Sequence, residues 1–304
     1  MRYAVTGAAG FIGSHLAEAL VAAGHEVVGL DTFTDSYDPR LKEENAANLA
    51  IERVDLAEDP LELADFDAVF HLAGQPGVRS FGDVFPLYLR RNVLATQRVF
   101  EAAAAAGVRV VYASSSSIYG EAEGFPTSED AVPRPISPYG ITKLACEHLA
   151  RAYAKGFGLD AIGLRYFTVY GPRQRPDMAF RRMTDALASG GRFPLYGDGG
   201  QSRGFTYVAD AVTATIAALE APIGSIYNVG GGSEATMREA ISTLEAVSGR
   251  TLELDTGPPA TGDVRRTAAD TSRIRADLGW EPTVGLEGGL RELWSWTSGR
   301  VAAR

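Results

Sequence analysis

Residues 1–13 read MRYAVTGAAGFIG, a short apolar run followed by glycines at positions 7, 10 and 13. The run Arg2 to Thr6 predicts a β-strand, and the apolar periodicity after the last glycine predicts a helix. A glycine turn between a strand and a helix lets the backbone approach a pyrophosphate, which then faces the helix N-terminus. This stretch therefore predicts a dinucleotide site.

Strand and helix patterns alternate through the first half of the chain, which predicts an α/β fold with a doubly wound parallel sheet of the Rossmann type. Apolar runs without alternation fit strands that are buried on both faces. We expect strands at 26–30, 68–72, 108–113 and 160–166, with helices at 14–23, 87–106 and 138–157.

After Tyr170 the chain becomes rich in Gly, Pro and Arg loops with short helices between them, such as 179–188 and 237–248. This change in composition predicts a smaller, interleaved C-terminal lobe that binds the substrate. We expect the cofactor domain to cover 1–170, with 204–229 returning to it, and the lobe to cover 171–203 and 230–304.

The composition is that of a globular protein, with 45% hydrophobic and 22% charged residues among 304. A net charge of −9 disfavours a nucleic-acid surface, which needs a basic face. The one cysteine, Cys146, excludes an intrachain disulfide and fits a reducing, cytoplasmic setting. We expect no secretion signal, no membrane span and no metal site, because neither the apolar runs nor the spacing of His, Cys and Asp fits one.

Asp31 follows the second predicted strand, 18 residues after Gly13. A carboxylate at this position accepts hydrogen bonds from ribose hydroxyls and repels a 2′-phosphate, which favours NAD over NADP. Asp55 and Leu56 follow a third strand. They could hold the adenine edge, although Asp55 is equally plausible as the start of a helix.

Tyr139 and Lys143 lie four residues apart on one predicted helix, so their side chains share a face. An ammonium group favours the tyrosinate form, which lets tyrosine act as a base. A hydroxyl donor is expected in the run Ser114 to Ser117, just past a buried strand, because ligands of open α/β sheets bind outside the carboxyl ends of the strands.

Together these motifs resemble the extended short-chain dehydrogenase/reductases, and within them the nucleotide-sugar 4-epimerases. The resemblance continues through His71-Leu72-Ala73-Gly74, the stretch 165–172, and residues 197–203 and 262–264, so it covers essentially the whole chain. It implies a homodimer formed through the helices that contain 87–106 and 139–157, and a catalytic set of Ser115, Tyr139 and Lys143. It further implies NAD contacts from Gly7, Gly10, Phe11, Ile12, Gly13, Asp31, Asp55, Leu56, Leu72, Ala73, Gly74, Tyr139, Lys143 and Val169.

Two departures within the resemblance narrow the substrate. Sugar 4,6-dehydratases carry an Asp-Glu pair directly after the catalytic hydroxyl, whereas this chain has Ser116 and Ser117, and the Glu of UDP-glucuronate decarboxylases is also missing. The loop Arg173-Gln-Arg-Pro-Asp-Met-Ala179 resembles that of UDP-glucuronate 4-epimerases. Arg175 is therefore expected to grip a sugar carboxylate. Arg79 is a second candidate for this contact. The alternative for Arg175 and for Arg79 is a surface arginine that faces solvent and has no ligand.

The resemblance also implies contacts to the sugar and the diphosphate of a UDP-sugar. Arg203 and Arg265 are candidates for binding the diphosphate. Because Arg266 follows directly, either Arg265 or Arg266 could make the second contact. Thr168 stands where many members of the family have Asn. The expected substrate contacts are thus Arg79, Ser116, Ser117, Thr168, Arg175, Arg203 and Arg265.

Three functions remain open on the sequence. The first is C4 epimerisation of UDP-glucuronate to UDP-galacturonate through a transient 4-keto sugar. The second is the same reaction on UDP-glucose or UDP-N-acetylglucosamine. The third is a non-catalytic NAD-binding scaffold, which has no physical need for Ser115, Tyr139 and Lys143 together.

Overall fold

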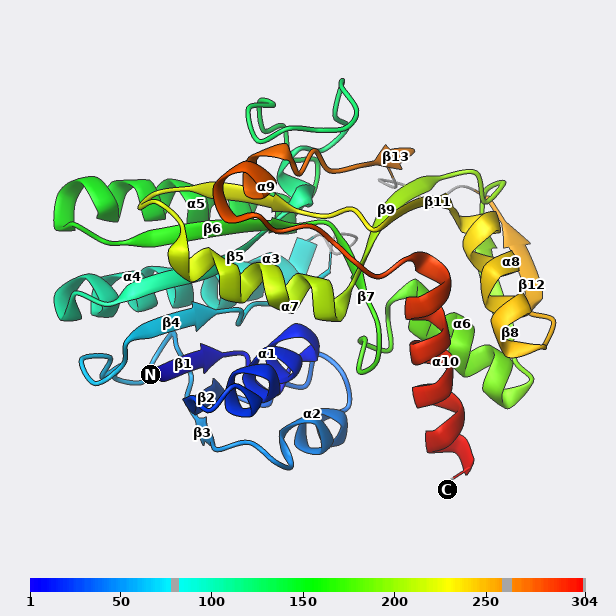
Figure 1. Ribbon diagram of the computed structural model, residues 1–304, viewed down its shortest axis with the longest axis horizontal. Helices are drawn as coiled ribbons and strands as arrows, with labels where there is room; N and C mark the ends of the chain where they lie inside the picture. The colour runs from blue at the N-terminus through cyan, green and yellow to red at the C-terminus, as the bar shows by residue number, and fades with distance from the viewer. Residues whose placement is uncertain (78–81, 259–263, 303–304) are drawn as a thin grey trace.

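The computed structural model describes residues 1–77, 82–258 and 264–302. Figure 1 shows a large α/β domain that contains the N-terminus and a smaller lobe that contains the end of the chain. The lobe packs beside one end of the large sheet, so the two parts meet where the strands of that sheet end.

Within the described residues, seven parallel strands form the large sheet in the order β10-β6-β5-β4-β1-β2-β3. This arrangement confirms the predicted α/β fold class with a doubly wound parallel sheet. The strands are β1 (Arg2–Thr6), β2 (Glu26–Asp31), β3 (Ile51–Arg53), β4 (Ala68–His71), β5 (Arg109–Ser115), β6 (Ala161–Tyr166) and β10 (Ile226–Val229).

Helices cover both faces of this sheet. They are α1 (Phe11–Ala22), α2 (Pro39–Ala46), α3 (Phe85–Tyr88), α4 (Ala95–Ala106), α5 (Pro138–Phe157), α7 (Val208–Ala217) and α9 (Ser272–Leu278), with short turns η1 (Gly82–Val84), η3 (Ser116–Ile118) and η4 (Ala218–Glu220).

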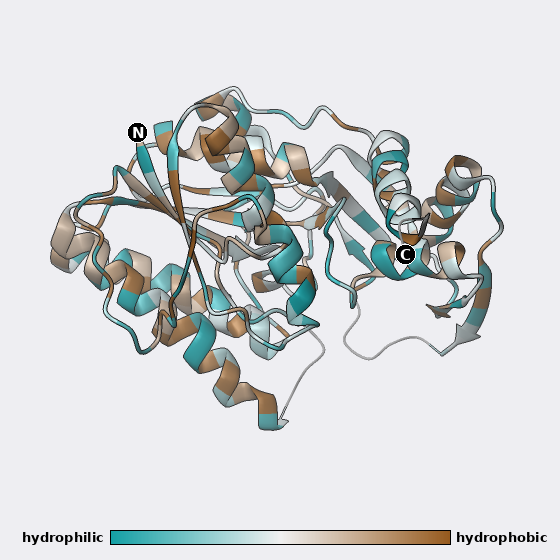
Figure 2. Cartoon of the chain, turned by 90° about the horizontal axis from the view of Figure 1, so that it is seen from below, coloured by the Kyte–Doolittle hydropathy of each residue, from teal (hydrophilic) through white to brown (hydrophobic). Residues whose placement is uncertain are grey.

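Successive side chains of a strand point to opposite faces, and β1 therefore contributes to two cores. Tyr3 and Val5 pack in the core that contains α1 and α7, whereas Ala4 packs in the core that contains α4 and α5. Figure 2 shows apolar residues along the central strands and both apolar and polar residues on the surrounding helices. Strands buried on both faces explain the apolar runs of the sequence.

The strand order reverses between β1 and β4, since β2 and β3 lie to one side of β1 and the later strands lie beyond β4. A crevice forms at such a switch point, outside the carboxyl ends of the strands. The glycine turn follows β1 and Leu72 to Gly74 follow β4, so both segments open onto this crevice.

The predicted helix over 87–106 is one helical stretch with an irregular centre. Between α3 and α4 the chain forms a π-helical turn, η2 (Leu89–Leu94). Asn92 lies in this turn, and its amide donates to Thr142 Oγ1 (3.0 Å) while its Oδ1 accepts from the Gln75 N–H (2.6 Å). π-turns inside helices often mark functional sites.

The smaller lobe has its own core, formed by residues such as Phe180, Phe205 and Leu290. Among its described residues, the strands form a four-stranded sheet and a separate two-stranded one. The elements are β7 (Thr168–Tyr170), β8 (Arg192–Tyr196), β9 (Ser202–Tyr207), β11 (Ser233–Thr236), β12 (Glu253–Gly257), β13 (Arg266–Thr267), α6 (Ala179–Ser189), α8 (Met237–Ser248) and α10 (Leu286–Ala302).

Strand pairing and core packing cross the predicted domain boundary. Segment 204–229 was expected in the large domain, but β9 pairs with β7, β11 and β13 in the lobe, and the chain rejoins the large domain only at α7. Conversely, Ile274 and Trp280 pack in the core beneath α1 and α7, although 230–304 was expected in the lobe. Short strands that pair across the boundary leave no compositional signal.

A buried ion pair holds α5 on the sheet. Arg165 on β6 donates from Nε and Nη2 to the two carboxylate oxygens of Glu147 (3.0 and 2.8 Å), and the two side chains are 6% and 5% exposed. Ser114, at the end of β5, donates to Glu147 Oε1 at 2.5 Å. Glu147 thus joins α5 to two neighbouring strands.

We expect Arg165→Met to lower the free energy of unfolding by about 3–5 kcal/mol, because it leaves the Glu147 charge buried without a partner. The measurement is unfolding in guanidinium chloride. The control is Arg192→Met, whose side chain is 55% exposed beside Asp255 and should cost at most about 1 kcal/mol. Equal losses in the two variants would contradict this account.

Candidate active site

A pocket of about 820 Å³ lies where the large domain meets the lobe. Its walls come from the carboxyl ends of the parallel strands, from α5 and from lobe segments around Arg175 and Phe193. The structure brings the following predicted site residues together in its lining: Gly7, Gly10, Phe11, Ile12, Gly13, Asp31, Asp55, Leu56, Leu72, Ala73, Gly74, Ser115, Ser116, Ser117, Tyr139, Lys143, Thr168, Val169, Arg175 and Arg203.

The glycine turn is packed too tightly for side chains. A Cβ on Gly13 would lie 2.1 Å from the carbonyl oxygen of Gly7, and Gly7 itself has φ +71°. Helix α1 starts at Phe11, so its free N–H groups face the pocket. This narrow cradle at a helix N-terminus has the shape and the polarity that a pyrophosphate requires.

Asp31 is held in place by the backbone. Its Oδ2 accepts the Ala9 N–H (3.1 Å) and its Oδ1 accepts the Phe33 N–H (2.8 Å). The carboxylate is 9% exposed and lines the pocket at the end of β2. It therefore lies where the ribose hydroxyls of a dinucleotide bound on the glycine turn would reach it.

Asp55 also lines the pocket, but its carboxylate is already engaged. It accepts the Ala57 N–H (3.0 Å) and pairs with Arg90 at 2.7 Å. Burial acts to raise the pKa of Asp55, and these two hydrogen bonds outweigh it and lower the pKa. The hydrogen bond from the Ala57 N–H to the Asp55 side chain closes a turn, and no α-helix starts at Asp55.

Helix α5 carries the predicted base and its lysine. Ser137 caps the helix by accepting the Gly140 N–H (3.1 Å), so Tyr139 stands in the first turn. Lys143, 4% exposed, donates to the Ala113 carbonyl (2.9 Å) and its Nζ lies 5.9 Å from the Tyr139 ring centroid. The ammonium is therefore fixed between the end of β5 and the tyrosine.

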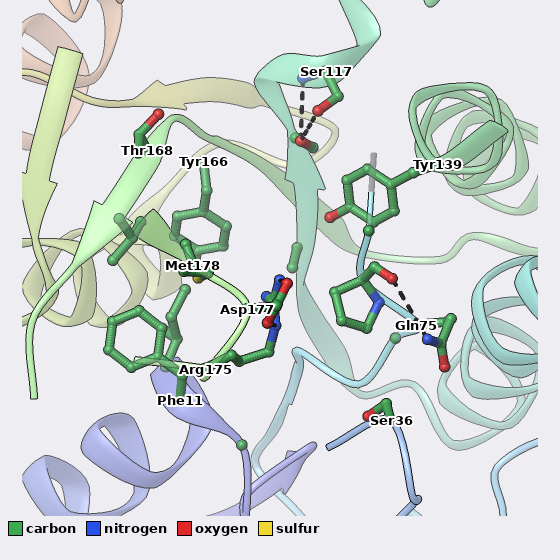
Figure 3. A pocket seen from close by; sticks show the side chains of 18 of the residues that line it. Phe11, Ser36, Gln75, Ser117, Tyr139, Tyr166, Thr168, Arg175, Asp177 and Met178 are labelled. Carbon is green, nitrogen blue, oxygen red and sulfur yellow. Dashed lines mark hydrogen bonds and ion pairs between the residues drawn. The ribbon is translucent and has the colours of Figure 1, made fainter. Parts of the chain in front are cut away.

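Ser115, at the end of β5, lines the same pocket as this pair. Its hydroxyl caps the turn η3 by accepting the Ser117 N–H (3.1 Å), and it also bonds the Ser117 hydroxyl at 3.1 Å. Figure 3 shows Ser117 above the pocket and Tyr139 beside it. A hydroxyl and a tyrosine in one pocket can bind the same substrate oxygen.

Arg175 enters the pocket from the lobe side. Its Nε and Nη2 bond the two carboxylate oxygens of Asp177 (3.0 and 2.9 Å), and the Arg175 side chain is 23% exposed. Figure 3 shows this pair within the pocket, near Phe11 and Met178. The structure thus brings a planar guanidinium, which suits a carboxylate ligand, into the space that holds Tyr139.

Two predicted substrate contacts, Arg79 and Arg265, remain. Arg79 is outside the described residues. Arg265 is exposed and does not line the pocket, although its neighbours Val264 and Thr267 do. Arg266 is paired with Glu234 (2.6 and 2.9 Å), so neither arginine reaches the pocket in this arrangement. Arg266 lies on β13, which pairs with β9.

The pocket also contains residues that the sequence analysis did not single out. Lys42 is 6% exposed, donates to Thr34 Oγ1 (2.8 Å) and lies 5.0 Å from the Tyr37 ring centroid; burial lowers the pKa of Lys42. Burial likewise raises the pKa of Tyr37 to about 12. On the lobe side, the lining includes Phe193 to Tyr196. The sequence signal that could have indicated residues 193–196 was the apolar run Phe-Pro-Leu-Tyr within a glycine-rich region.

The described residues contain no group of three or more His, Cys, Asp or Glu arranged to hold a metal ion. In the same parts of the chain, we find no helix with the length and apolar character needed to cross a bilayer.

Comparison with known proteins identifies the family. Residues 3–230 match the model of the NAD dependent epimerase/dehydratase family, and the chain belongs to this family. This assignment confirms the resemblance drawn from the motifs.

Individual relatives cover nearly the whole chain. The crystal structure of a UDP-glucuronic acid 4-epimerase from Bacillus cereus, in complex with UDP-glucuronic acid and NAD, is 41% identical, covers 99% of this chain and 100% of its own, and has a TM-score of 0.95. An uncharacterized UDP-glucose epimerase of Bacillus subtilis is 42% identical over 95% of this chain and 96% of its own. A UDP-glucose 4-epimerase of Mycolicibacterium smegmatis is 38% identical over 95% and 96%.

His71 gives a prediction on pH. Its ring lies between Thr6 Oγ1 (2.8 Å) and Thr96 Oγ1 (2.9 Å), and burial, aided by the Lys143 charge, lowers the pKa of His71 to about 3. The unfolded chain binds this proton below a pKa of about 6.5, whereas the folded protein excludes it down to about 3. His71 therefore removes stability as the pH falls through this window.

We expect His71→Gln to flatten the dependence of unfolding free energy on pH between 4 and 6 by up to about 1.4 kcal/mol per pH unit, relative to the unsubstituted protein. Urea unfolding at each pH measures both slopes, and the comparison is independent of any constant loss of stability. Identical slopes would show that His71 takes up its proton in the folded state.

Proposed function

We propose that this protein is an NAD-dependent isomerase that epimerises UDP-glucuronate at C4 to UDP-galacturonate. The observation that carries the proposal is the presence of Arg175 in the same pocket as Ser115, Tyr139 and Lys143. The relative that was solved with UDP-glucuronic acid and NAD supports it, since that protein matches this one from end to end.

The residues of the large domain fit NAD. The glycine turn and the start of α1 would hold the pyrophosphate, and Asp31 would hold the ribose hydroxyls. Leu72 to Gly74 and Val169 line the pocket deeper in, on the way to Lys143. When bound, NAD supplies the acceptor and donor for the C4 hydride.

Tyr139 removes the proton of the C4 hydroxyl as the hydride leaves C4, which produces a 4-keto sugar. The keto sugar turns over within the pocket, the hydride returns to the opposite face of C4, and Tyr139 gives the proton back. Lys143 places its ammonium 5.9 Å from the centroid of the Tyr139 ring, and Ser115 binds the same sugar oxygen as Tyr139. No atom or electron is gained or lost over the cycle.

Arg175 protects the intermediate. The 4-keto form of a uronic acid is a β-keto acid, which loses carbon dioxide when the breaking bond aligns with the carbonyl π system. A guanidinium that binds both carboxylate oxygens restricts rotation of the carboxylate and keeps the bond out of alignment. Ser116, Ser117 and Thr168 line the remainder of the sugar site, and Arg203 would bind the diphosphate.

A second candidate is the same reaction on UDP-glucose or UDP-N-acetylglucosamine. The similarity to UDP-glucose epimerases of two bacteria favours it. In that case Arg175 would keep Asp177 as its partner and would have no part in turnover. The scaffold alternative is weakest, because it leaves the pocket's serine, tyrosine and lysine without a purpose.

The test is turnover of UDP-glucuronate, UDP-glucose and UDP-N-acetylglucosamine by the wild type and by Arg175→Ala, followed by proton NMR at C4. We expect the wild type to convert the uronate. In Arg175→Ala, kcat/KM for the uronate should fall on the order of 100-fold, because a bidentate charged contact is lost. A decarboxylated product should appear beside the epimer.

The control for this variant is Arg2→Ala. It breaks a pair with Glu26 (2.8 Å) at the start of β1, away from the pocket, and should leave turnover unchanged. Wild-type rates on the uronate in Arg175→Ala would refute the clamp. Turnover of the neutral sugars alone by the wild type would establish the second candidate instead.

We also propose a cytoplasmic homodimer. The free thiol of Cys146 fits the reducing compartment, and large apolar side chains are exposed on the helices that were expected at the interface. They are Phe85, Leu89 and Leu94 on α3 to η2 and Ile141 and Phe157 on α5.

Sedimentation equilibrium should give twice the chain mass of 32.3 kDa, and Leu94→Arg should lower the measured mass. A wild-type mass of one chain would refute the dimer.

A further inference from the structure

The loop from Gly171 to Met178, here named the clamp loop, joins β7 to α6 and carries Arg175. Two residues before Arg175, Arg173 has φ +63°, a left-handed conformation that is uncommon for a residue with a side chain. Such a conformation persists only where surrounding contacts hold it. The contacts of the clamp loop therefore show what holds its backbone in this conformation.

The first contact is an ion pair to the cofactor domain. Arg173 Nη2 donates to Glu18 Oε1 at 2.8 Å, and the two side chains are 23% and 35% exposed. Glu18 lies on α1, the helix whose N-terminus faces the dinucleotide cradle. The pair thus connects the strained residue of the clamp loop to the helix that serves the cofactor.

The second contact lies one turn earlier on the same face of α1. His15 Nε2 donates to the Pro172 carbonyl at 2.9 Å, because a carbonyl can only accept. Burial lowers the pKa of His15, and the Arg173 charge acts in the same direction while Glu18 opposes it. The neutral ring with its proton on Nε2 fits this bond, and α1 thereby holds two successive residues of the loop.

The other side of the clamp loop is fixed within the lobe. Gln174 is 2% exposed; its Nε2 donates to the Val169 carbonyl (3.2 Å) and its Oε1 accepts the Arg181 N–H (3.1 Å). Arg175 follows directly, and Asp177 orients its guanidinium. These contacts hold the clamp loop from both sides, and the path of the loop between them places Arg175 in the pocket.

We propose that His15, Glu18 and Arg173 are positioning residues for substrate specificity: helix α1 binds the dinucleotide with its first turn and aims the carboxylate-binding Arg175 with its next two turns. The inference rests on the proposed function for the role of Arg175. It adds that selectivity for a uronate is controlled from the cofactor helix, by residues that touch neither substrate nor cofactor.

The experiment compares the purified holoenzyme with Glu18→Gln and with Asp160→Asn. Glu18→Gln keeps the shape of the side chain and removes its charge. Asp160→Asn is the matched control, because Asp160 pairs with Arg109 (2.8 Å) at 25% and 24% exposure just before β6, at the opposite end of the sheet from the pocket. Arg173→Gln serves as a second variant that breaks the same pair from the loop side.

Two quantities are measured on each protein. Hydrogen exchange of the amides of the clamp loop reports its order without any substrate, and we expect faster exchange in Glu18→Gln and Arg173→Gln but not in Asp160→Asn. The ratio of kcat/KM for UDP-glucuronate to that for UDP-glucose reports selectivity. It should fall about tenfold in both variants, the loss expected for one charge-assisted contact.

The outcomes separate this inference from the proposed function. Unchanged exchange in the clamp loop would overturn it, as would faster exchange with an unchanged selectivity ratio in an enzyme that prefers the uronate. If the wild type shows no preference for the uronate, the specificity part of the proposed function fails, and the exchange data alone then decide whether α1 holds the loop. Equal losses in Asp160→Asn would reduce the effect to general destabilisation and overturn the inference.

Discussion

The buried ion pair between Glu147 and Arg165 joins helix α5 to the central sheet where the parallel strands end. One turn earlier on the helix, Lys143 bonds the carbonyl of Ala113, while Glu147 receives the hydroxyl of Ser114. Two turns of α5 are therefore fixed to two successive residues of β5. The separation between α5, which carries Tyr139, and β5, which ends at Ser115, depends on these contacts, because charged hydrogen bonds in a low-dielectric interior tolerate little displacement.

The pocket divides its work between the two parts of the molecule. The large domain contributes the glycine turn after β1, Asp31 at the end of β2, and Tyr139 and Lys143 on α5. The lobe side of the pocket contributes Arg175, Arg182 and Arg203 beside one carboxylate, Asp177, so this side carries an excess of positive charge in a chain whose net charge is −9. An anionic substrate is attracted to such a local field in spite of the overall sign, since exposed charges beyond about 8–10 Å are screened by salt.

How much of the site the sequence predicted depends on how local each contact is. The glycine turn, and the Tyr139 and Lys143 pair, depend on neighbours within a few residues, and their spacing was readable. The hydrogen bond of Asn92 to Gln75, which lines the pocket, was not predicted, because Asn92 faces Gln75 and Thr142 only when η2 packs against α5. Lys42 likewise looks like one charge in a polar helix until the fold buries it. The lobe boundary at β9 was misplaced because its strand partners come from three distant segments.

The sequence by itself determined the order of the main strands and helices, the glycine turn after the first strand, and the placement of Tyr139 and Lys143 on one helix, because these follow from periodicity and from spacings that a single turn or helix enforces. Only the tertiary structure decided which arginines face the pocket. Arg175 points inward and Arg265 outward although both occupy glycine- and proline-rich loops. The loop of Arg175 contacts α1 through Arg173 and Glu18, and Arg265 precedes β13, which pairs with β9. Both contacts join residues more than 60 positions apart, so the local sequence carries no sign of them.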